Sequence, residues 1–235
     1  MFHVVSETIE RTKQIVGYNE DILDVCFVGE TESLAVASNS EQIRIYNRDT
    51  IDCTILYGHS DMVLSLTSSH DKTLLVSGSK DNTVLIWDAK DGYKNIGSCV
   101  GHTSAVSAVG MSKLSNKWIL SASHDRTLKL WDITSPTNPK SKFTVHAHEG
   151  DIQCVDISPN DKLIVSCGLD KTAKLWSMDA TPLGTFKGHK RGIWGVKFSP
   201  VDQMIATCST DKTIKLWSLT DFTCLKVIAD LNLDL

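Results

Sequence analysis

Four copies of one spaced set of residues constrain this chain more than any other feature. In each copy a His is followed after 18 or 19 residues by Ser or Thr, after 22 or 23 by Asp, and after 28 or 29 by Trp. Successive tryptophans lie 44, 45 and 41 residues apart, which is the period of a four-stranded propeller blade. The sets are His59, Ser77, Asp81, Trp87; His102, Ser121, Asp125, Trp131; His148, Ser166, Asp170, Trp176; and His189, Thr207, Asp211, Trp217.

Alternating apolar and polar residues around these sets predict β-strands. VLIW, LKLW, AKLW and IKLW have the period of two that is typical of half-buried strands, and tight-turn residues precede each of them. Each repeat therefore contains a strand after the His, one ending near the Ser or Thr, one carrying the Trp, and a fourth that follows. The sequence predicts an all-β propeller in one domain, residues 1–235, with blades at about 57–100, 101–147, 148–187 and 188–228.

A degenerate repeat precedes these four, at about residues 17–56. In it Tyr18, Val36, Ser40 and Tyr46 stand in the places of His, Ser, Asp and Trp. The aromatic volume at the Trp position is retained, but the polar set is not. We expect residues 1–16 to supply an outer strand of a preceding blade and residues 229–235 to form a tail. About five blades leave an open array, which we expect to be marginally stable or prone to aggregation, because both end faces lack a neighbour.

The repeated residues can form a chain of hydrogen bonds from carboxylate to imidazole, to hydroxyl, to indole N–H. A Ser–His–Asp triad is the alternative interpretation, but a catalytic set occurs once per domain and no G-x-S-x-G motif is present. A zinc site is a second alternative, because His146 and His148 are close in sequence, yet further ligands are missing. We therefore interpret all four sets as structural and predict no catalytic residue, no metal and no cofactor.

Composition gives little further information on function. The net charge is −4, so the chain as a whole carries no basic field for nucleic acid. Its seven cysteines include no C-x-x-C pair and lie mostly in apolar stretches, which is typical of buried residues in a reducing compartment.

One local basic patch is predicted on the face where the His loops and the Asp turns meet. It could bind RNA phosphates or an acidic protein segment, and the alternative is an ordinary solvated rim. We expect Trp194 and Trp118, which lie off the repeat positions, to belong to the core rather than to a binding surface. The patch consists of Arg126, Lys171, Lys190, Arg191 and Lys212.

The Gly-His starts and the Trp-Asp ends at 87–88 and 131–132 resemble the WD-repeat family. That resemblance implies a β-propeller, usually of seven blades, and covers nearly all of residues 17–228. Trp176 and Trp217 are followed by Ser instead of Asp, a mild departure. The family resemblance is specific for fold and says little about function.

GYNEDILDV, SPNDKLIVSCGLDKTAKLW and GHKRGIWGVKFSP are similar to the tandem-propeller proteins of the small-subunit processome. This resemblance implies a non-enzymatic nucleolar scaffold in pre-ribosomal RNA processing, whose partners are other propeller subunits, with contact to pre-rRNA or snoRNA allowed. It implies neither a membrane nor a small-molecule substrate, and it implies that these residues are part of a second propeller. The alternative is a general WD-repeat adaptor, such as a ubiquitin-ligase substrate receptor.

Overall fold

The computed structural model describes residues 2–5, 8–11, 20–30 and 33–229, and these residues form strands, turns and loops without a helix. Five four-stranded antiparallel sheets follow one another along the chain. The first sheet contains β3 (Ile22–Val28), β4 (Ser33–Ser38), β5 (Ile43–Tyr46) and β6 (Cys53–Leu56). The second contains β7 (Val63–Ser68), β8 (Leu74–Ser79), β9 (Thr83–Asp88) and β10 (Lys94–Val100).

The other three sheets repeat this pattern. They are β11 (Val106–Met111), β12 (Trp118–Ser123), β13 (Thr127–Asp132) and β14 (Lys140–His146); β15 (Ile152–Ile157), β16 (Leu163–Gly168), β17 (Thr172–Ser177) and β18 (Pro182–Lys187); and β19 (Ile193–Phe198), β20 (Met204–Ser209), β21 (Ile214–Ser218) and β22 (Cys224–Ile228). In addition, β1 (Phe2–Val5) pairs with β2 (Thr8–Arg11). Tyr18 and residues 230–235 of the predicted tail at 229–235 lie outside the described residues.

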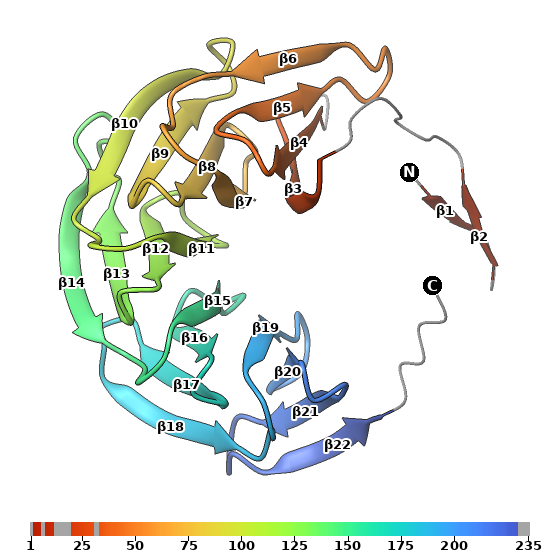
Figure 1. Cartoon of the computed structure of the whole chain (residues 1–235), viewed down its shortest axis with the longest axis vertical. Coiled ribbons are helices and arrows are strands. Elements are labelled where there is room, and N and C mark those ends of the chain that lie inside the picture. The colour runs from red at the N-terminus through yellow and green to blue at the C-terminus, as the bar shows by residue number, and fades with distance from the viewer. Residues whose placement is uncertain (1, 6–7, 12–19, 31–32, 230–235) are drawn as a thin grey trace.

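The five sheets are arranged as blades around a central axis, with the first strand of each blade innermost and the fourth outermost (Figure 1). The arc is not closed between the fifth blade and the first. The prediction of an all-β array of about five four-stranded blades is confirmed. Each blade has two ends. We call the end that carries the loop before the first strand and the turn between the second and third strands the His–Asp face, and the opposite end the hairpin face.

Apolar side chains fill the space between successive blades. Between the fourth and fifth blades, for example, Leu175 and Phe186 pack with Ile193, Val196 and Trp217. The described residues leave the two end faces without such cover. Val25 of the first blade is 48% exposed, whereas Leu66, at the same position of the second blade, is 5% exposed. At the other end, Cys208 of the fifth blade is exposed, whereas Cys167, at the same position of the fourth, is 0% exposed. The first and fifth blades therefore each leave one apolar face uncovered. These two faces correspond to the two surfaces that pack together between successive blades.

A β-bulge interrupts the innermost strand of all five blades at the same place, just after its first residue. Side chains at this bulge connect neighbouring blades. Asp24 accepts a hydrogen bond from the Leu66 N–H at 2.8 Å, and Ser65 accepts one from the Val109 N–H at 3.2 Å. These bonds tie each blade to the next one near the axis.

On the hairpin face, each junction pairs a residue of one outer strand with a residue of the next blade's last turn. Gly97 lies against the Pro136 carbonyl oxygen, in the loop at 132–140, and Gly184 lies against the Phe222 ring. In each of these blades the outer-strand residue pairs with the third-strand residue that directly precedes the Trp. Gly97 and Gly184 occupy this position in the second and fourth blades, and Phe143 occupies it in the third. There the size relation is reversed, because the corresponding turn residue of the fourth blade is Ala180. At Gly184 a glycine thus meets a large ring, and at the preceding junction the sizes of the residues at these two positions are exchanged.

Candidate interaction face

The four residues of each repeated set meet at the His–Asp face. The His Nδ1 atom lies 2.8–2.9 Å from the Asp carboxylate, and the His Nε2 atom lies 2.7–2.8 Å from the Ser or Thr hydroxyl oxygen. The same hydroxyl oxygen accepts the Trp Nε1–H at 2.8–3.0 Å. Since the hydroxyl has one proton, it donates that proton to Nε2, and Nδ1–H donates to the carboxylate. In this arrangement the ring proton lies on Nδ1.

A threonine two residues after each Asp completes the set. Its hydroxyl donates to the other carboxylate oxygen at 2.6–2.8 Å. The backbone N–H after each His donates to the first oxygen at 2.9–3.2 Å. The Asp-x-Thr spacing was visible in the sequence and is the signal that could have identified these residues: Thr83, Thr127, Thr172 and Thr213.

These contacts lower the pKa of all four Asp carboxyl groups, and burial lowers the pKa of two of the imidazoles. Burial alone would raise the pKa of the Asp125 carboxyl group, but hydrogen bonds from the Thr127 hydroxyl, the Thr103 N–H and His102 outweigh burial and hold the pKa at about 2. Burial lowers the pKa of His59 and His102 below the ordinary 6.5, although the paired carboxylate acts in the opposite direction. The sets are thus internally satisfied in the neutral pH range.

Although each set has the order of contacts of a hydrolase triad, its hydroxyl group cannot reach a substrate. Ser77, Ser121 and Ser166 are 0% exposed, and Thr207 is 1% exposed. Metal binding by His148 meets a similar obstacle, because both of its ring nitrogens already have protein partners. Within the described ranges, no three His, Cys, Asp or Glu side chains converge as metal ligands, and no helix is long and apolar enough to span a membrane.

The degenerate first blade is held differently. Val36 is buried and Tyr46 is half-buried, while the Ser38 hydroxyl donates to the Glu20 carboxylate at 2.6 Å. Asn39 Nδ2 donates to the Asp21 carboxylate at 3.0 Å. The His–Asp face of this blade therefore carries two carboxylates, Glu20 and Asp21, in the segment before β3.

All five predicted residues of the basic patch are exposed on the His–Asp face, and we call them the basic rim: Arg126, Lys171, Lys190, Arg191 and Lys212. Arg126, Lys171 and Lys212 occupy the same turn position in three successive blades, each with a positive φ of 64–68°. Asp211 accepts a hydrogen bond from the backbone N–H of Lys190, so this bond does not engage the Lys190 ammonium group. The structure thus brings the predicted cations onto one side of the third to fifth blades.

The expectation that Trp194 belongs to the core is wrong. Trp194 is 54% exposed at the His–Asp end of β19, three residues after Arg191. Leu169, in the turn of the fourth blade, is also exposed and contacts Gly192 of the fifth. Trp118 is half-buried, and the Lys142 ammonium lies 4.6 Å from its ring centroid. An exposed aromatic ring therefore accompanies the basic rim.

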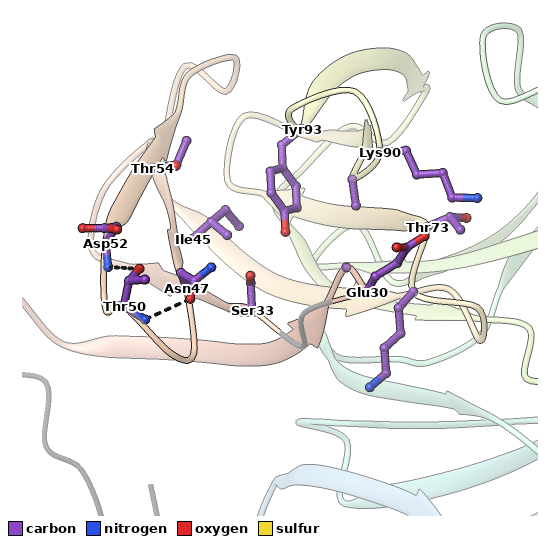
Figure 2. A pocket seen from close by; sticks show the side chains of 13 residues that line it. Glu30, Ser33, Ile45, Asn47, Thr50, Asp52, Thr54, Thr73, Lys90 and Tyr93 are labelled. Carbon is purple, nitrogen blue, oxygen red and sulfur yellow. Dashed lines mark hydrogen bonds between the residues drawn. The ribbon is translucent and has the colours of Figure 1, made fainter.

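The hairpin face carries a hollow of about 580 Å³ between the first two blades (Figure 2). Tyr93 projects into it from the second blade, and Ser33, Asn47 and Thr54 line the side of the first. Asn47 is held in its turn, because its side-chain oxygen accepts the Thr50 N–H at 3.1 Å. Side chains of both charges stand at the walls, so the hollow has no clear preference for an anion or a cation: Glu30, Asp52, Lys72 and Lys90.

Comparisons with known proteins agree with this architecture. Residues 52–88, 93–132, 139–177 and 180–218 match the family described as WD domain, G-beta repeat. Human transducin beta-like protein 3 is 41% identical over 205 residues, which cover 80% of this chain and 25% of that protein. U3 small nucleolar RNA-associated protein 13 of Saccharomyces cerevisiae is 36% identical over 211 residues, covering 79% and 26%. The chain thus spans about a quarter of the length of these two relatives.

A third relative matches a shorter stretch. DDB1- and CUL4-associated factor 13 of Dictyostelium discoideum is 38% identical over 84 residues, which cover 36% of this chain and 18% of that protein. The similarity to the first two relatives is therefore spread over about twice as much of the chain.

Proposed function

Because the chain belongs to the WD-repeat family, we propose that it is a non-enzymatic scaffold of the small-subunit processome, which binds other subunits during pre-ribosomal RNA processing in the nucleolus. The observation that carries this proposal is the extent of the similarity to U3 small nucleolar RNA-associated protein 13 and transducin beta-like protein 3. It covers about four-fifths of this chain, about twice as much as the match to DDB1- and CUL4-associated factor 13. The fold supports it, because rigid blades present exposed loops and turns for docking.

A ubiquitin-ligase adaptor is the second candidate function. It is favoured by the match to DDB1- and CUL4-associated factor 13, whose name describes association with DDB1 and CUL4. That match covers little more than a third of the chain, so we rank it below the first.

Purification of the tagged chain from cells separates the two functions. The scaffold role predicts enrichment of processome proteins together with U3 snoRNA and precursor rRNA, and nucleolar localisation of the tagged chain. A chain in which Trp131 and Trp176 are both replaced by Ala serves as the control, because it should lose the blade structure and these partners together. Enrichment of DDB1 and CUL4 without U3 snoRNA would establish the adaptor function instead.

A further inference from the structure

The basic rim lacks carboxylate partners. Among the residues that the structure describes, no carboxylate oxygen lies within 4.0 Å of any of its five charged groups, whereas Lys113, Lys142 and Lys197 do have such partners. Arg126, Lys171 and Lys212 each directly follow the Asp of a repeated set, whose oxygens are engaged by the internal hydrogen bonds described above. The rim therefore presents uncompensated positive charge in a chain whose net charge is −4.

The rim is one continuous surface across three blades. The Arg126 carbonyl oxygen accepts the His148 N–H at 3.5 Å, which links the third blade to the fourth. Gly192, next to Arg191, packs against Leu169 in the turn that also contains Lys171. The turns and loops that carry the rim are thus in contact across both junctions.

Three half-buried lysines add to this charge at the outer side of the same blades, two residues before each Trp. We call Lys129, Lys174 and Lys215 the junction lysines. The Lys174 ammonium donates to the Ala147 carbonyl oxygen at 2.6 Å, and the Lys129 ammonium donates to the Thr144 hydroxyl at 3.0 Å. The Lys215 ammonium lies 6.0 Å from the Trp217 ring centroid. These partners are neutral, so they hold the ammonium groups in place without cancelling their charge.

Composition distinguishes between the two anionic ligands that such a surface could take. Protein interfaces are depleted in Lys, especially at their centres, whereas six of the eight cations in the rim and junction groups are lysines. Phosphate backbones are bound by Lys and Arg with release of counterions. The exposed Trp194 ring adds a surface on which an unpaired base can stack, which is the second component of single-strand binding sites.

We propose that the basic rim, the junction lysines and Trp194 form a binding site for single-stranded RNA, in which the cations contact successive phosphates and the Trp194 ring stacks on a base. This proposal deepens the scaffold function and rests on it for its biological setting. It assigns direct RNA contact to one face of the third to fifth blades and leaves the hairpin face to protein partners.

The test measures binding of the purified full chain to a fluorescent single-stranded RNA of about 20 nucleotides, by fluorescence anisotropy between 50 and 200 mM salt. The first variant combines Lys171→Gln, Lys190→Gln, Arg191→Gln and Lys212→Gln. The matched control removes four exposed charges from the hairpin face: Lys90→Gln, Lys94→Gln, Lys117→Gln and Lys162→Gln. Thermal melting of each variant verifies that it is folded.

Each phosphate contact contributes about 0.7 to the slope of log affinity against log salt for single strands, which corresponds to about fivefold per contact at 0.1 M salt. We expect the rim variant to bind at least tenfold more weakly with a shallower slope, and the control to stay within about twofold of the parent chain. Trp194→Ala should weaken the binding of single-stranded RNA at least about fivefold and leave the binding of a duplex of the same length unchanged. Trp194→Phe should retain binding of the single strand.

Equal binding by the rim variant and its control would overturn the proposal. So would binding of a polyglutamate peptide but not of RNA, because the surface would then serve an acidic protein segment. The assay uses only the purified chain and synthetic RNA, so its failure would leave recovery of processome proteins from cells unaffected. Conversely, loss of that recovery would refute the scaffold function without changing the affinity measured here.

Discussion

The size relation at the blade junctions makes a specific prediction about compensation between two residues. The Phe222 ring lies against Gly184 and 5.3 Å from the Phe186 ring, with an interplanar angle of 59°. One junction earlier, the large residue is in the outer strand, as Phe143, and the small one is in the turn, as Ala180. Phe222 and Ala180 have nearly the same backbone conformation, with φ of 61° and 63°. Exchanging the sizes by Gly184→Phe together with Phe222→Ala should therefore reproduce the earlier junction.

The magnitudes follow from burial. Truncation of a fully buried Phe to Ala costs about 3–5 kcal/mol, and Phe222 is only half-buried, so Phe222→Ala should lower the free energy of unfolding by about 2 kcal/mol. In Gly184→Phe the new Cβ atom would overlap the Phe222 ring, an overpacking that costs about 1–3 kcal/mol. The double variant removes the overlap and refills the space. It should lose about 1 kcal/mol in total, which gives a coupling energy of at least about 2 kcal/mol.

Urea denaturation followed by tryptophan fluorescence measures all four chains of this cycle, because Trp217 lies 5.8 Å from Phe186 and reports on the same junction. Gly92→Phe, at an exposed glycine with no atom within 4 Å of its added Cβ atom, is the control for a large residue in place of Gly, although its positive φ adds strain. If the two single effects simply add in the double variant, these junctions are not governed by complementary size.

Three further predictions concern the repeated sets and the uncovered ends. Thr207→Ser should change the free energy of unfolding by less than about 0.5 kcal/mol, since the other three sets contain Ser. Thr207→Val should lower it by about 2–4 kcal/mol, because His189 and Trp217 each lose a buried hydrogen bond. Equal effects of the two variants in urea denaturation would contradict this. In the folded chain the pKa of His59 and His102 lies below 6.5, so the unfolded chain binds protons first and the free energy of unfolding should decline below about pH 6.5. It should decline again below about pH 4, because Asp125, with a folded pKa of about 2, stays ionised while the unfolded chain binds protons. A melting temperature that is constant from pH 8 to 5 would refute the first part. Phe27→Glu, in the uncovered face of the first blade, should reduce concentration-dependent self-association in light scattering, and unchanged association would show that this face is not involved.

The repeated sets illustrate what the sequence could predict. The offset from His to Trp depends on two strands and two tight turns whose lengths vary by at most one residue, so constant spacing implies constant geometry. The Asp-x-Thr spacing recurs in all four sets as well, but because Thr is also common in turns, the spacing alone does not show that its hydroxyl group bonds the carboxylate.

Trp194 shows where prediction from alternation fails. An apolar residue next to Ile193 reads as part of a buried strand, but the bulge between Ile193 and Gly195 breaks the period of two. Beyond such a bulge, the face on which a side chain emerges does not follow from its position in the sequence. The junction pairs are hidden for a related reason: Ala180 and Phe222 follow their Trp by four and five residues, and either partner can be the large one.

The second blade lies next to the proposed RNA site, which begins at the third blade. It therefore offers a gain-of-function test. Asn82 occupies the turn position of Arg126, Lys171 and Lys212 with the same positive φ, 70°. Because the Asp81 oxygens are already engaged by His59, Thr83 and backbone N–H groups, a lysine at position 82 would remain available to a ligand. Asn82→Lys should therefore steepen the salt slope for single-stranded RNA by about 0.7 and raise affinity up to about fivefold at 0.1 M salt. Asn138→Lys adds the same charge at an exposed site on the hairpin face; if it raises affinity equally, net charge and not the position of the rim determines RNA binding.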